Sequence, residues 1–537
     1  MSAPLPSPAS EASGSVRLNA PHDAQAQGLI VSGFSALPCA KALFLRFGWG
    51  AEAASAKAAL WRKIQELAPI SDADGKEDSA AVLAFTFTGL KALGLADAAL
   101  DSFSIPFKEG MFQPDRLRRL GDRYDGEWLP SVVDGGPLWS GNVGAAAPAV
   151  VARLEAVERA TEETVSTPLA IHALLTLYDA TPDKLEQRAG AVEAALLACG
   201  VVVERTLALS LHIEGDKKVA REHFGFADGV SQPTPFSLET EEEGLDPAQA
   251  AVTPARRDPW NGAPLGDFLF GHRDSHHERA QGPLVADDER GRAAGLPQDG
   301  APEGFRNLGL DGTYMVVREL RQDVAAFWRS AHRGAEALRR EDPSATHVTA
   351  EWLAERIVGR TRDGHLLCPS GPLAARSDGA PRNDFGFRMD DPYGIGCPTG
   401  SHVRRANPRD GLAHDAASAP TMLASSNSHR ILRRGRNYGP KVADPSVDDG
   451  AERGLLFICL NTDIARQFEF IQQNWILNPS FATLFREKDP LVGPAGEFTI
   501  REEPLRRVAP VETFVRMAGG EYFFLPSLPA LNYLFTS

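Results

Sequence analysis

Alternating and helical patterns of hydrophobic residues predict six regular elements in the first half of the chain. Period-two alternation and short apolar runs predict strands, whereas an apolar stripe at helical spacing predicts a helix. The expected strands are 41–49, 80–89, 169–180 and 201–215, and the expected helices are 51–68 and 182–200. The order strand, helix, strand, strand, helix, strand is that of a ferredoxin-like domain built on an antiparallel sheet.

The second half of the chain repeats this order of elements. Strands are expected at 312–320, 454–463 and 519–528, and helices at 321–340 and 464–475. We therefore predict an α+β protein with two ferredoxin-like domains, related by a structural duplication without a measurable sequence repeat. Two such domains facing one another would leave a pocket between them.

Shifts in composition divide the chain into four predicted regions. Residues 1–24 are rich in Ser, Ala and Pro and are expected to form a disordered leader. An N-terminal domain is expected over 25–238 and a C-terminal domain over 311–537. Between them, residues 239–310 are rich in Pro, Gly, Asp and Arg. A connection of this length is usually either functional or disordered.

The overall composition indicates a folded protein that does not bind polyanions. Of the 537 residues, 43% are hydrophobic and 24% charged, which suffices for a sizeable core. The 56 Lys and Arg residues are outnumbered by 71 Asp and Glu residues, giving a formal net charge of −15. An acidic chain of this kind argues against a nucleic-acid partner or an anionic membrane surface. We therefore expect a small-molecule or protein partner, and the sequence leaves the oligomeric state open.

Cysteine usage and the N-terminal segment both predict the cytoplasm. The five cysteines are odd in number and form no C-x-x-C pair, so neither a zinc ribbon nor a disulfide framework is indicated. We expect reduced, buried thiols at Cys39, Cys199, Cys368, Cys397 and Cys459. No run of about 18 apolar residues occurs. The first residues carry neither a basic n-region nor a twin-arginine signal.

The stretch HFGFADGVSQP, residues 223–233, places a single carboxylate, Asp228, beside glycines in an apolar run. A carboxylate in apolar surroundings loses water, which raises its pKa unless it finds a partner or carries out chemistry. The flanking glycines predict a tight turn or a close approach of the backbone to a bulky group. A turn in which Asp228 only accepts hydrogen bonds from nearby backbone N–H groups is the alternative that the stretch leaves open.

The stretch GIGCPTGSHVRRANPRDG, residues 394–411, places His402 near Arg404, Arg405 and Arg409. Nearby positive charge disfavours the imidazolium form, so this histidine is expected to be neutral, which is the form that binds metals. A neutral imidazole within a cationic cluster suits haem, whose propionates bind arginine and whose iron binds a histidine nitrogen. An ordinary surface or core histidine is the alternative.

Two further stretches add a cation and an apolar wall. In SNSHRILRRGRNYGP, residues 426–440, a strand with Ile431 and Arg433 on one face would point a guanidinium inward, where it needs an anionic or peroxide-like acceptor. A solvated basic loop is the alternative. In GLLFICL, period two places Leu455, Phe457 and Cys459 on one strand face. Such a face would provide one wall of a dry pocket.

Taken together, these motifs resemble those of the dye-decolorising peroxidases, a haem family with two ferredoxin-like domains. The resemblance is carried, in chain order, by GFADG, SHVRRANPR, ILRRGRNYG, GLLFICL and FEFIQQNW. It also includes QGLIVSGF and GTYMVVREL, and so covers about residues 27–530. Two features depart from the family pattern: Asn437 stands where Pro is expected, and the leader of exported members is missing. The long insertions resemble the bacterial branch of the family.

The resemblance implies a role for each candidate residue. His402 would be the proximal iron ligand, Asp228 the distal acid/base and Arg433 the distal cation. Leu455 and Phe457 would line the haem pocket, which is expected between the sheet and the helices of the C-terminal domain. The arginines that flank His402, namely Arg404, Arg405 and Arg409, would bind the cofactor, expected to be haem b.

The implied reaction is reduction of hydrogen peroxide coupled to oxidation of a small organic reductant, such as a dye or a phenol. Asp228 would move a proton from one peroxide oxygen to the other, which requires one carboxylate within hydrogen-bond reach. Arg433 would stabilise the developing charge, by on the order of 3 kcal/mol if it acts like other preorganised donors. A haem-binding or haem-handling protein with incidental peroxidase activity is the alternative function.

Three secondary expectations complete this interpretation. A carboxylate should accept the N–H of His402 and raise its basicity. Glu469, in the apolar helix FEFIQQNW, is the first candidate, and Asp463, the expected helix N-cap, is the second. Large reductants would need an aromatic relay, for which Trp475 and Tyr393 are the candidates nearest in sequence. The histidines of GHRDSHH, which are His272, His276 and His277, are expected to be a solvated loop rather than a metal site.

Overall fold

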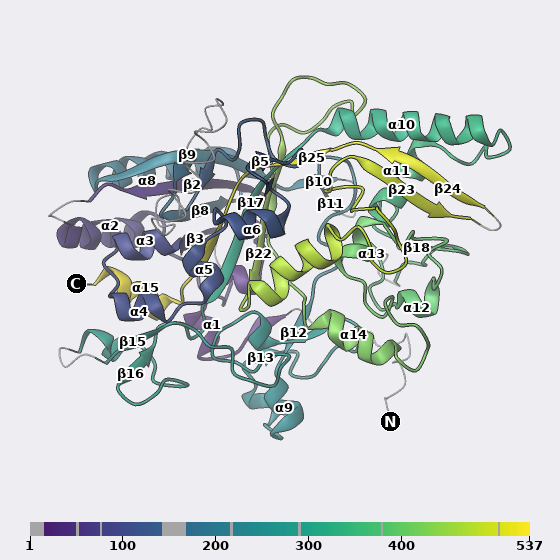
Figure 1. The fold of residues 1–537 in the computed structure, drawn as a ribbon. Coiled ribbons are helices and arrows are strands. Elements are labelled where there is room, and N and C mark those ends of the chain that lie inside the picture. The colour runs from purple at the N-terminus through teal and green to yellow at the C-terminus, as the bar shows by residue number, and fades with distance from the viewer. Residues whose placement is uncertain are drawn as a thin grey trace.

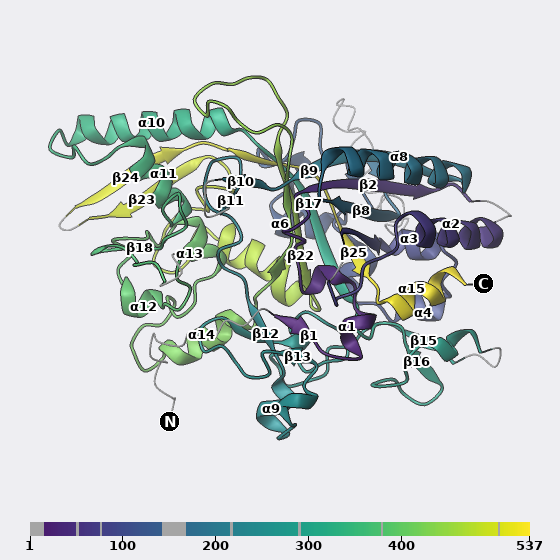
Figure 2. The same cartoon turned by 180° about the vertical axis from the view of Figure 1, so that it is seen from behind.

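The computed structural model describes residues 16–49, 53–75, 78–141, 168–214, 219–287, 291–376, 380–502 and 505–536. Within these residues, the two predicted sets of elements lie on opposite sides of a central group of strands (Figure 1). The view from behind shows the same arrangement, with the longest helix of each half on opposite sides (Figure 2).

The N-terminal half forms a four-stranded antiparallel sheet with two helices. Its strands are β2 (Cys39–Phe47), β3 (Ser79–Phe85), β8 (Ala173–Asp179) and β9 (Val201–Ser210), and its helices are α2 (Ala53–Leu67) and α8 (Pro182–Ala198). The strands pair in the order β9, β2, β8, β3. Helix α8 starts with an N-cap, because Thr181 accepts a hydrogen bond from the N–H of Lys184 and Pro182 fits the first turn. The predicted ferredoxin-like order is confirmed.

The C-terminal half has the corresponding elements in the predicted order. They are β17 (Thr313–Gln322), α10 (Val324–Glu341), β22 (Gly454–Asn461) and β25 (Val515–Leu525). Strand β17 lies between β22 and β25 and pairs antiparallel with both. The helix predicted at 464–475 consists of two π-helical turns, η5 (Ala465–Glu469) and η6 (Ile471–Ile476). π-Helical turns are rare and occur frequently at functional sites.

The strands of both halves form one sheet whose pairings close on themselves. Strand β21 (Arg436–Tyr438) pairs with β22 on one side and with β9 on the other, which joins the halves once. Strand β25 joins them again, since Phe524 pairs with Phe85 of β3. The sequence of pairings thus runs β17, β22, β21, β9, β2, β8, β3, β25 and back to β17.

Alternating side chains of each strand enter two separate cores. On β2, Leu43 and Leu45 pack with residues of the covering helices, including Ile64 of α2. Ala42 and Phe44, one residue out of step, belong to a second core made largely by the sheet strands themselves. Strand side chains alternate between faces, so the same period that predicted the strands also divides their residues between the cores.

The remaining helices were not predicted from the sequence. They are α3 (Phe87–Ala92), α4 (Asp97–Asp101), α5 (Ile105–Glu109), α6 (Pro114–Leu120), α11 (Ala350–Val358), α12 (Phe387–Asp390), α13 (His402–Ala406), α14 (Ala419–Asn427) and α15 (Leu528–Phe535). Most are short, and a few turns carry little periodic signal. The sequence also gave no indication of the hairpin formed by β23 (Gly496–Arg501) and β24 (Arg506–Val511).

Part of the predicted N-terminal leader belongs to the fold. Residues 1–15 lie outside the described part of the chain, but residues 16–24 belong to the fold. They contribute strand β1 (Arg17–Leu18), which pairs with β13 (Val252–Thr253), and the beginning of helix α1 (His22–Gln25). The expectation of disorder throughout 1–24 is therefore wrong for this part, because its backbone hydrogen bonds are made to a segment more than 230 residues away.

The connection 239–310 is ordered over most of its length. It runs along the lower side of the molecule in both views (Figures 1 and 2). Its elements are short: helix α9 (Leu238–Glu242) and strands β13, β14 (Gly262–Pro264), β15 (Leu284–Ala286) and β16 (Phe305–Asn307). Phe268, Leu269 and Phe270 are fully buried. These apolar anchors, rather than regular secondary structure, hold the segment against the sheet.

Two predictions about the whole chain concern cysteines and membrane spans. None of the five cysteines is bonded to another in the structure. Cys397 and Cys459 are buried as predicted, whereas Cys39, Cys199 and Cys368 are only half-buried, so the prediction of burial is wrong for these three. Over the described residues, no helix combines the length and hydropathy needed to cross a membrane.

Candidate active site

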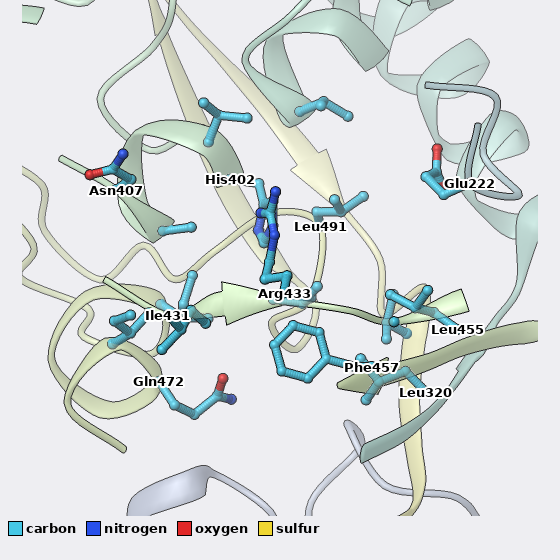
Figure 3. A pocket seen from close by; sticks show the side chains of 18 of the residues that line it. Glu222, Leu320, His402, Asn407, Ile431, Arg433, Leu455, Phe457, Gln472 and Leu491 are labelled. Atoms are coloured by element: carbon cyan, nitrogen blue, oxygen red, sulfur yellow. The ribbon is translucent and has the colours of Figure 1, made fainter. Parts of the chain in front are cut away.

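A cavity of about 320 Å³ lies between the two halves of the chain. Its walls come from the loop around Asp228, the end of β17, helix α13, the segment 429–435, strand β22 and the π-helical turns. Figure 3 shows His402 and Arg433 projecting into this space, with Leu455 and Phe457 along one wall. The four residues come from three separate segments, helix α13, the segment 429–435 and strand β22, and the tertiary structure brings them together around this cavity.

His402 is the first residue of helix α13, and a buried carboxylate fixes its orientation. Its Nδ1 lies 2.9 Å from Oδ2 of Asp489. Burial alone would raise the pKa of Asp489, but the adjacent His402 ring and the N–H of Val492 hold it below its ordinary value. An ionised Asp489 accepts the Nδ1–H and leaves Nε2 as the ring nitrogen free to bind a metal.

The partner of His402 is therefore Asp489. The prediction that Glu469 or Asp463 would accept the N–H of His402 was wrong. Glu469 is buried in another network, where its Oε1 accepts hydrogen bonds from Arg116 and from the hydroxyl of Tyr522. Asp463 caps the helix as expected, since its Oδ1 accepts from the N–H of Arg466. Asp489 lies in an irregular segment without hydrophobic periodicity, so no sequence pattern pointed to it.

The arginines beside His402 do not all face the cavity. Arg404 donates to the carbonyls of Asp391 and Cys397, and Arg405 donates to the carbonyls of Trp475 and Glu487. Arg404 and Arg405 are not among the described residues that line the cavity. The expectation that both contact the cofactor is wrong, because their guanidinium groups satisfy backbone carbonyls around helix α13.

Four other arginines accompany Arg433 in the cavity wall: Arg318, Arg360, Arg409 and Arg430. Arg409 was expected there, whereas the other three were not, and Arg318 is paired with Asp122. Burial lowers the pKa of Arg360 and of Arg430 to about 10, and for Arg430 the nearby Arg433 adds to the effect. In the described part of the chain, Nη1 of Arg430 is buried without a hydrogen-bond partner. Arg360 and Arg409 donate hydrogen bonds to neighbouring groups, so Nη1 of Arg430 is the donor on this cationic side that is best placed to bind an anionic group.

Arg433 lies on strand β20 (Leu432–Arg433), which pairs with β22. Its Nη2 donates to the carbonyl of Ser231 at 3.0 Å, in the same loop as Asp228. Gln232 of this loop also bonds the Arg433 backbone in both directions. These contacts connect the two predicted distal residues, although they are about 200 positions apart in the sequence.

The loop that carries Asp228 is tight but leaves this carboxylate exposed. Gly225 and Gly229 have φ values of 96° and 73°, which L-residues rarely adopt. Asp228 lines the cavity, is exposed to solvent, and accepts a hydrogen bond from the N–H of Gly229 at 2.6 Å. The expectation of a desolvated Asp228 is therefore not met by this structure.

The desolvated carboxyl group of this loop is that of Glu222, which the sequence analysis missed. It accepts hydrogen bonds from the backbone N–H groups of Phe224 and Phe226 at 2.7 and 2.9 Å, and from Gln322 at 3.0 Å. Burial raises the pKa of Glu222 to about 7 in spite of these donors. Glu222 also lines the cavity. A glutamate directly before an apolar run was the available signal.

The apolar wall matches the period-two prediction. Leu455 and Phe457 of β22 line the cavity, while Leu456 and Ile458 point into the second core. Cys459, expected on the cavity face, is fully buried in the core beneath the helices. The wall thus ends at Phe457.

Other aromatic and histidine side chains complete the cavity or lie away from it. Trp475 is buried in the wall and packs edge-on against His429, whose Nδ1 donates to the carbonyl of Arg466. Tyr393 is 62% exposed. The relay role of either aromatic residue stays a prediction. His272 was expected to be solvated, and this prediction is wrong: its side chain is buried and makes a hydrogen bond to Asp311.

Known proteins are similar to this chain in sequence and in fold. No family model matches the chain. The multifunctional dye peroxidase DyP2 of Amycolatopsis sp. is 31% identical over 385 residues, which cover 68% of this chain and 71% of that protein. Dye-decolorizing peroxidase msp1 of Mycetinis scorodonius is 28% identical over 84% of this chain and 75% of its own length.

Solved structures with the same fold include enzymes from bacteria and fungi. The structure of DyP2 from Amycolatopsis sp. superimposes with a TM-score of 0.62 and 24% identity, covering 98% of each chain. A fungal DyP-type peroxidase from Auricularia auricula-judae superimposes with a TM-score of 0.67 and 20% identity, covering 97% of this chain and all of the other. At these identities, the structures support the fold alone.

Proposed function

Because this chain belongs to the dye-decolorizing peroxidase family, we propose that the cavity between its two halves is where its reaction takes place. The protein is a haem peroxidase, an oxidoreductase that reduces peroxide at the expense of an organic reductant such as a dye. The curated relatives are named as peroxidases, which does not support the alternative of a haem-handling protein. We infer hydrogen peroxide as the oxidant, and the cytoplasmic location stays a prediction of the sequence.

The residues of the cavity suit haem. His402 presents Nε2 as a ligand for iron, and Asp489 holds the opposite ring nitrogen. The unpaired Nη1 of Arg430, together with Arg360 and Arg409, would bind the propionate groups. No cysteine is among the described residues that line the cavity, so none of them offers a thiol for a thioether link to the porphyrin. We therefore propose haem b.

Once bound, haem supplies the iron at which the peroxide O–O bond breaks. Asp228 would hold and move the proton, taking it from one peroxide oxygen and delivering it to the other, so that this second oxygen could leave as water. Arg433 donates hydrogen bonds to the peroxide and stabilises the negative charge that develops as the bond breaks.

The observation that carries this proposal is that Asp228, His402 and Arg433 line one cavity. Leu455 and Phe457 keep one side of that cavity apolar, which strengthens the electrostatic effect of Arg433 because fewer water molecules screen it. Glu222 is the nearest rival to Asp228, because it lines the same cavity and carries a carboxyl group with a raised pKa.

The test is to compare Asp228→Asn and Glu222→Gln in the haem-reconstituted protein. We expect both to show a Soret band, and Asp228→Asn to lose about 10²–10⁴-fold in the rate of the peroxide step. Dye turnover with hydrogen peroxide should fall in parallel. A protein that never develops a Soret band would refute the haem assignment, and an unchanged peroxide rate in Asp228→Asn would refute the acid/base role.

A further inference from the structure

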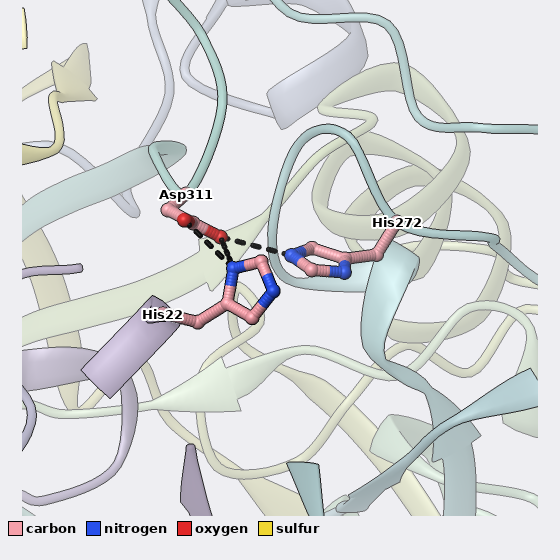
Figure 4. A group of neighbouring side chains, drawn as sticks. All are labelled: His22, His272 and Asp311. Atoms are coloured by element: carbon pink, nitrogen blue, oxygen red, sulfur yellow. Dashed lines mark hydrogen bonds and ion pairs between the residues drawn. The ribbon is translucent and has the colours of Figure 1, made fainter. Parts of the chain in front are cut away.

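Two histidines and one aspartate converge at a point distinct from the cavity (Figure 4). Nδ1 of His22 lies 2.9 Å from both carboxylate oxygens of Asp311, and Nε2 of His272 lies 2.9 Å from Oδ1 of the same group. The ligand atoms of all three residues lie within 4.8 Å of one another. None of the three residues lines the peroxidase cavity as described.

Three separate segments supply this cluster. His22 comes from helix α1 near the N-terminal end of the described chain, His272 from the long connection, and Asp311 from the turn before β17. Asp311 is fully buried, the side chain of His272 is 8% exposed and that of His22 is 22% exposed. Access from solvent therefore passes along His22, while the other two groups form the floor of the site.

The backbone and the surrounding charge also single out this position. Asp311 has a φ of 57°, a left-handed conformation that costs a non-glycine residue energy and is typical of sites that must hold one side chain in place. Two more carboxylates, Asp23 and Asp299, are close enough to act on the His22 ring electrostatically, and Glu239 interacts with the His272 ring in the same way. These carboxylates add negative charge around the two rings, although Asp299 also lies 3.7 Å from Nη1 of Arg279.

We propose that His22, His272 and Asp311 bind a divalent transition-metal ion, with Zn²⁺ the best match to the ligands. Two imidazole nitrogens and one carboxylate oxygen are typical zinc ligands, and water would complete the coordination. Zinc–ligand bonds of about 2.0–2.2 Å place neighbouring ligand atoms roughly 3–3.5 Å apart. The two 2.9 Å spacings between histidine and Asp311 need to open slightly, and the two imidazole nitrogens, which lie within 4.8 Å of one another, would adjust by rotation of the partly exposed His22 ring. Each ring would then carry its proton on the other nitrogen.

The proposed ion would act on the fold rather than on the peroxide reaction. It would attach the N-terminal segment and the connection to the start of β17, the strand whose far end reaches the cavity through Leu320. A ligand that binds only the folded state stabilises it, by an amount that grows with its concentration relative to the dissociation constant. We expect zinc to raise the melting temperature without changing the peroxide rate.

The experiment measures zinc in the full-length haem protein, treated with a chelator and then supplied with ZnCl₂. After removal of free metal, the wild-type protein should retain about one zinc per chain by mass spectrometry, and X-ray absorption at the zinc edge should show nitrogen and oxygen neighbours near ~2.0 Å. His22→Gln and His272→Gln should each weaken zinc binding more than tenfold. His276→Gln, an exposed histidine of the same loop, is the matched control and should behave like the wild type.

The outcomes separate a metal site from a hydrogen-bonded group of side chains. If the wild-type protein retains no zinc, or if His22→Gln retains as much as the wild type, the proposal is wrong. A lower melting temperature in the variants, with no effect of zinc on the wild type, would mean that the three residues only hydrogen-bond to one another. His22→Gln keeps the test valid if variants at the buried positions fail to fold, since His22 is partly exposed.

Discussion

Nδ1 of His402 and Oδ2 of Asp489 lie 2.9 Å apart, and the side chain of Asp489 has no exposed surface. The carboxylate also accepts the backbone N–H groups of Leu491 and Val492 at 2.9 and 3.0 Å, which fixes its position. A carboxylate held in this way selects the histidine tautomer and increases the electron donation of the ring to a bound metal. This pair determines how His402 would act on iron.

Asp489→Asn should weaken that donation while keeping a hydrogen-bonding side chain of similar shape. We expect a 10–100-fold loss in haem affinity or in the rate of the peroxide step, together with a more positive reduction potential of the haem iron. Spectroelectrochemistry measures the potential, which a purely structural role would leave unchanged. Asp463→Asn is the control, since Asn also caps helices well; equal potentials in the two variants would contradict the proposed pairing.

His402→Ala should abolish stable haem binding. The only other histidine described in the cavity wall, His429, donates its Nδ1–H to the Arg466 carbonyl at 2.6 Å and stacks on Phe470 with ring centroids 3.8 Å apart. These contacts hold the His429 ring against the wall. We therefore expect His429→Ala to retain haem, as judged by the ratio of Soret to protein absorbance. Near-normal occupancy in His402→Ala would overturn the ligand assignment.

Arg433→Leu should retain haem and slow the peroxide step. Loss of one preorganised donor typically costs about 10²–10³-fold in rate, and stopped-flow mixing with peroxide measures it directly. Arg433→Lys keeps the charge but not the planar donor pair, so a partial recovery is expected. If both variants react with peroxide as fast as the wild type, Arg433 does not face the peroxide.

The Glu222 carboxyl makes folding stability depend on pH near neutrality. The folded-state pKa of Glu222 is about 7, above the ordinary glutamate value of 4.5, because burial favours the neutral form. Between pH 4.5 and pH 7 the folded state therefore binds more protons than the unfolded state. The free energy that Glu222 contributes to folding is largest below pH 4.5 and is lost as the pH rises through 7. The total change is at most about 3 kcal/mol.

Melting temperatures measured from pH 4 to pH 8 test this linkage. The wild type should lose stability across the upper part of this range, and Glu222→Gln should lack that component because its side chain does not titrate. Asp228 contributes to the raised pKa of Glu222 through its charge, so Asp228→Asn should shift the transition to lower pH. Parallel pH profiles for the wild type and Glu222→Gln would count against a raised pKa.

The sequence alone predicted the order of strands and helices along the chain and selected the residues that we propose to react with peroxide. Period two along GLLFICL was enough to place Leu455 and Phe457 on one face, and that face lines the cavity. Asp228, His402 and Arg433 could also be selected, because each is a polar residue of a chemically specific type within a distinctive local motif. Local patterns of this kind survive folding, since strand and helix periods depend only on neighbouring residues.

Only the tertiary structure decided which charged groups meet. Arg404 and Arg405 adjoin His402 in sequence, yet their guanidinium groups bond backbone carbonyls, while Arg360 and Arg430 reach the cavity from other segments. Asp489 meets His402 across 87 positions. His22 and Asp311 meet across 289. Such pairs form only when segments far apart in sequence come together in the folded chain. A hydrophobic period does not predict them, because whether a charged group can be buried depends on its partner and not on its neighbours in sequence.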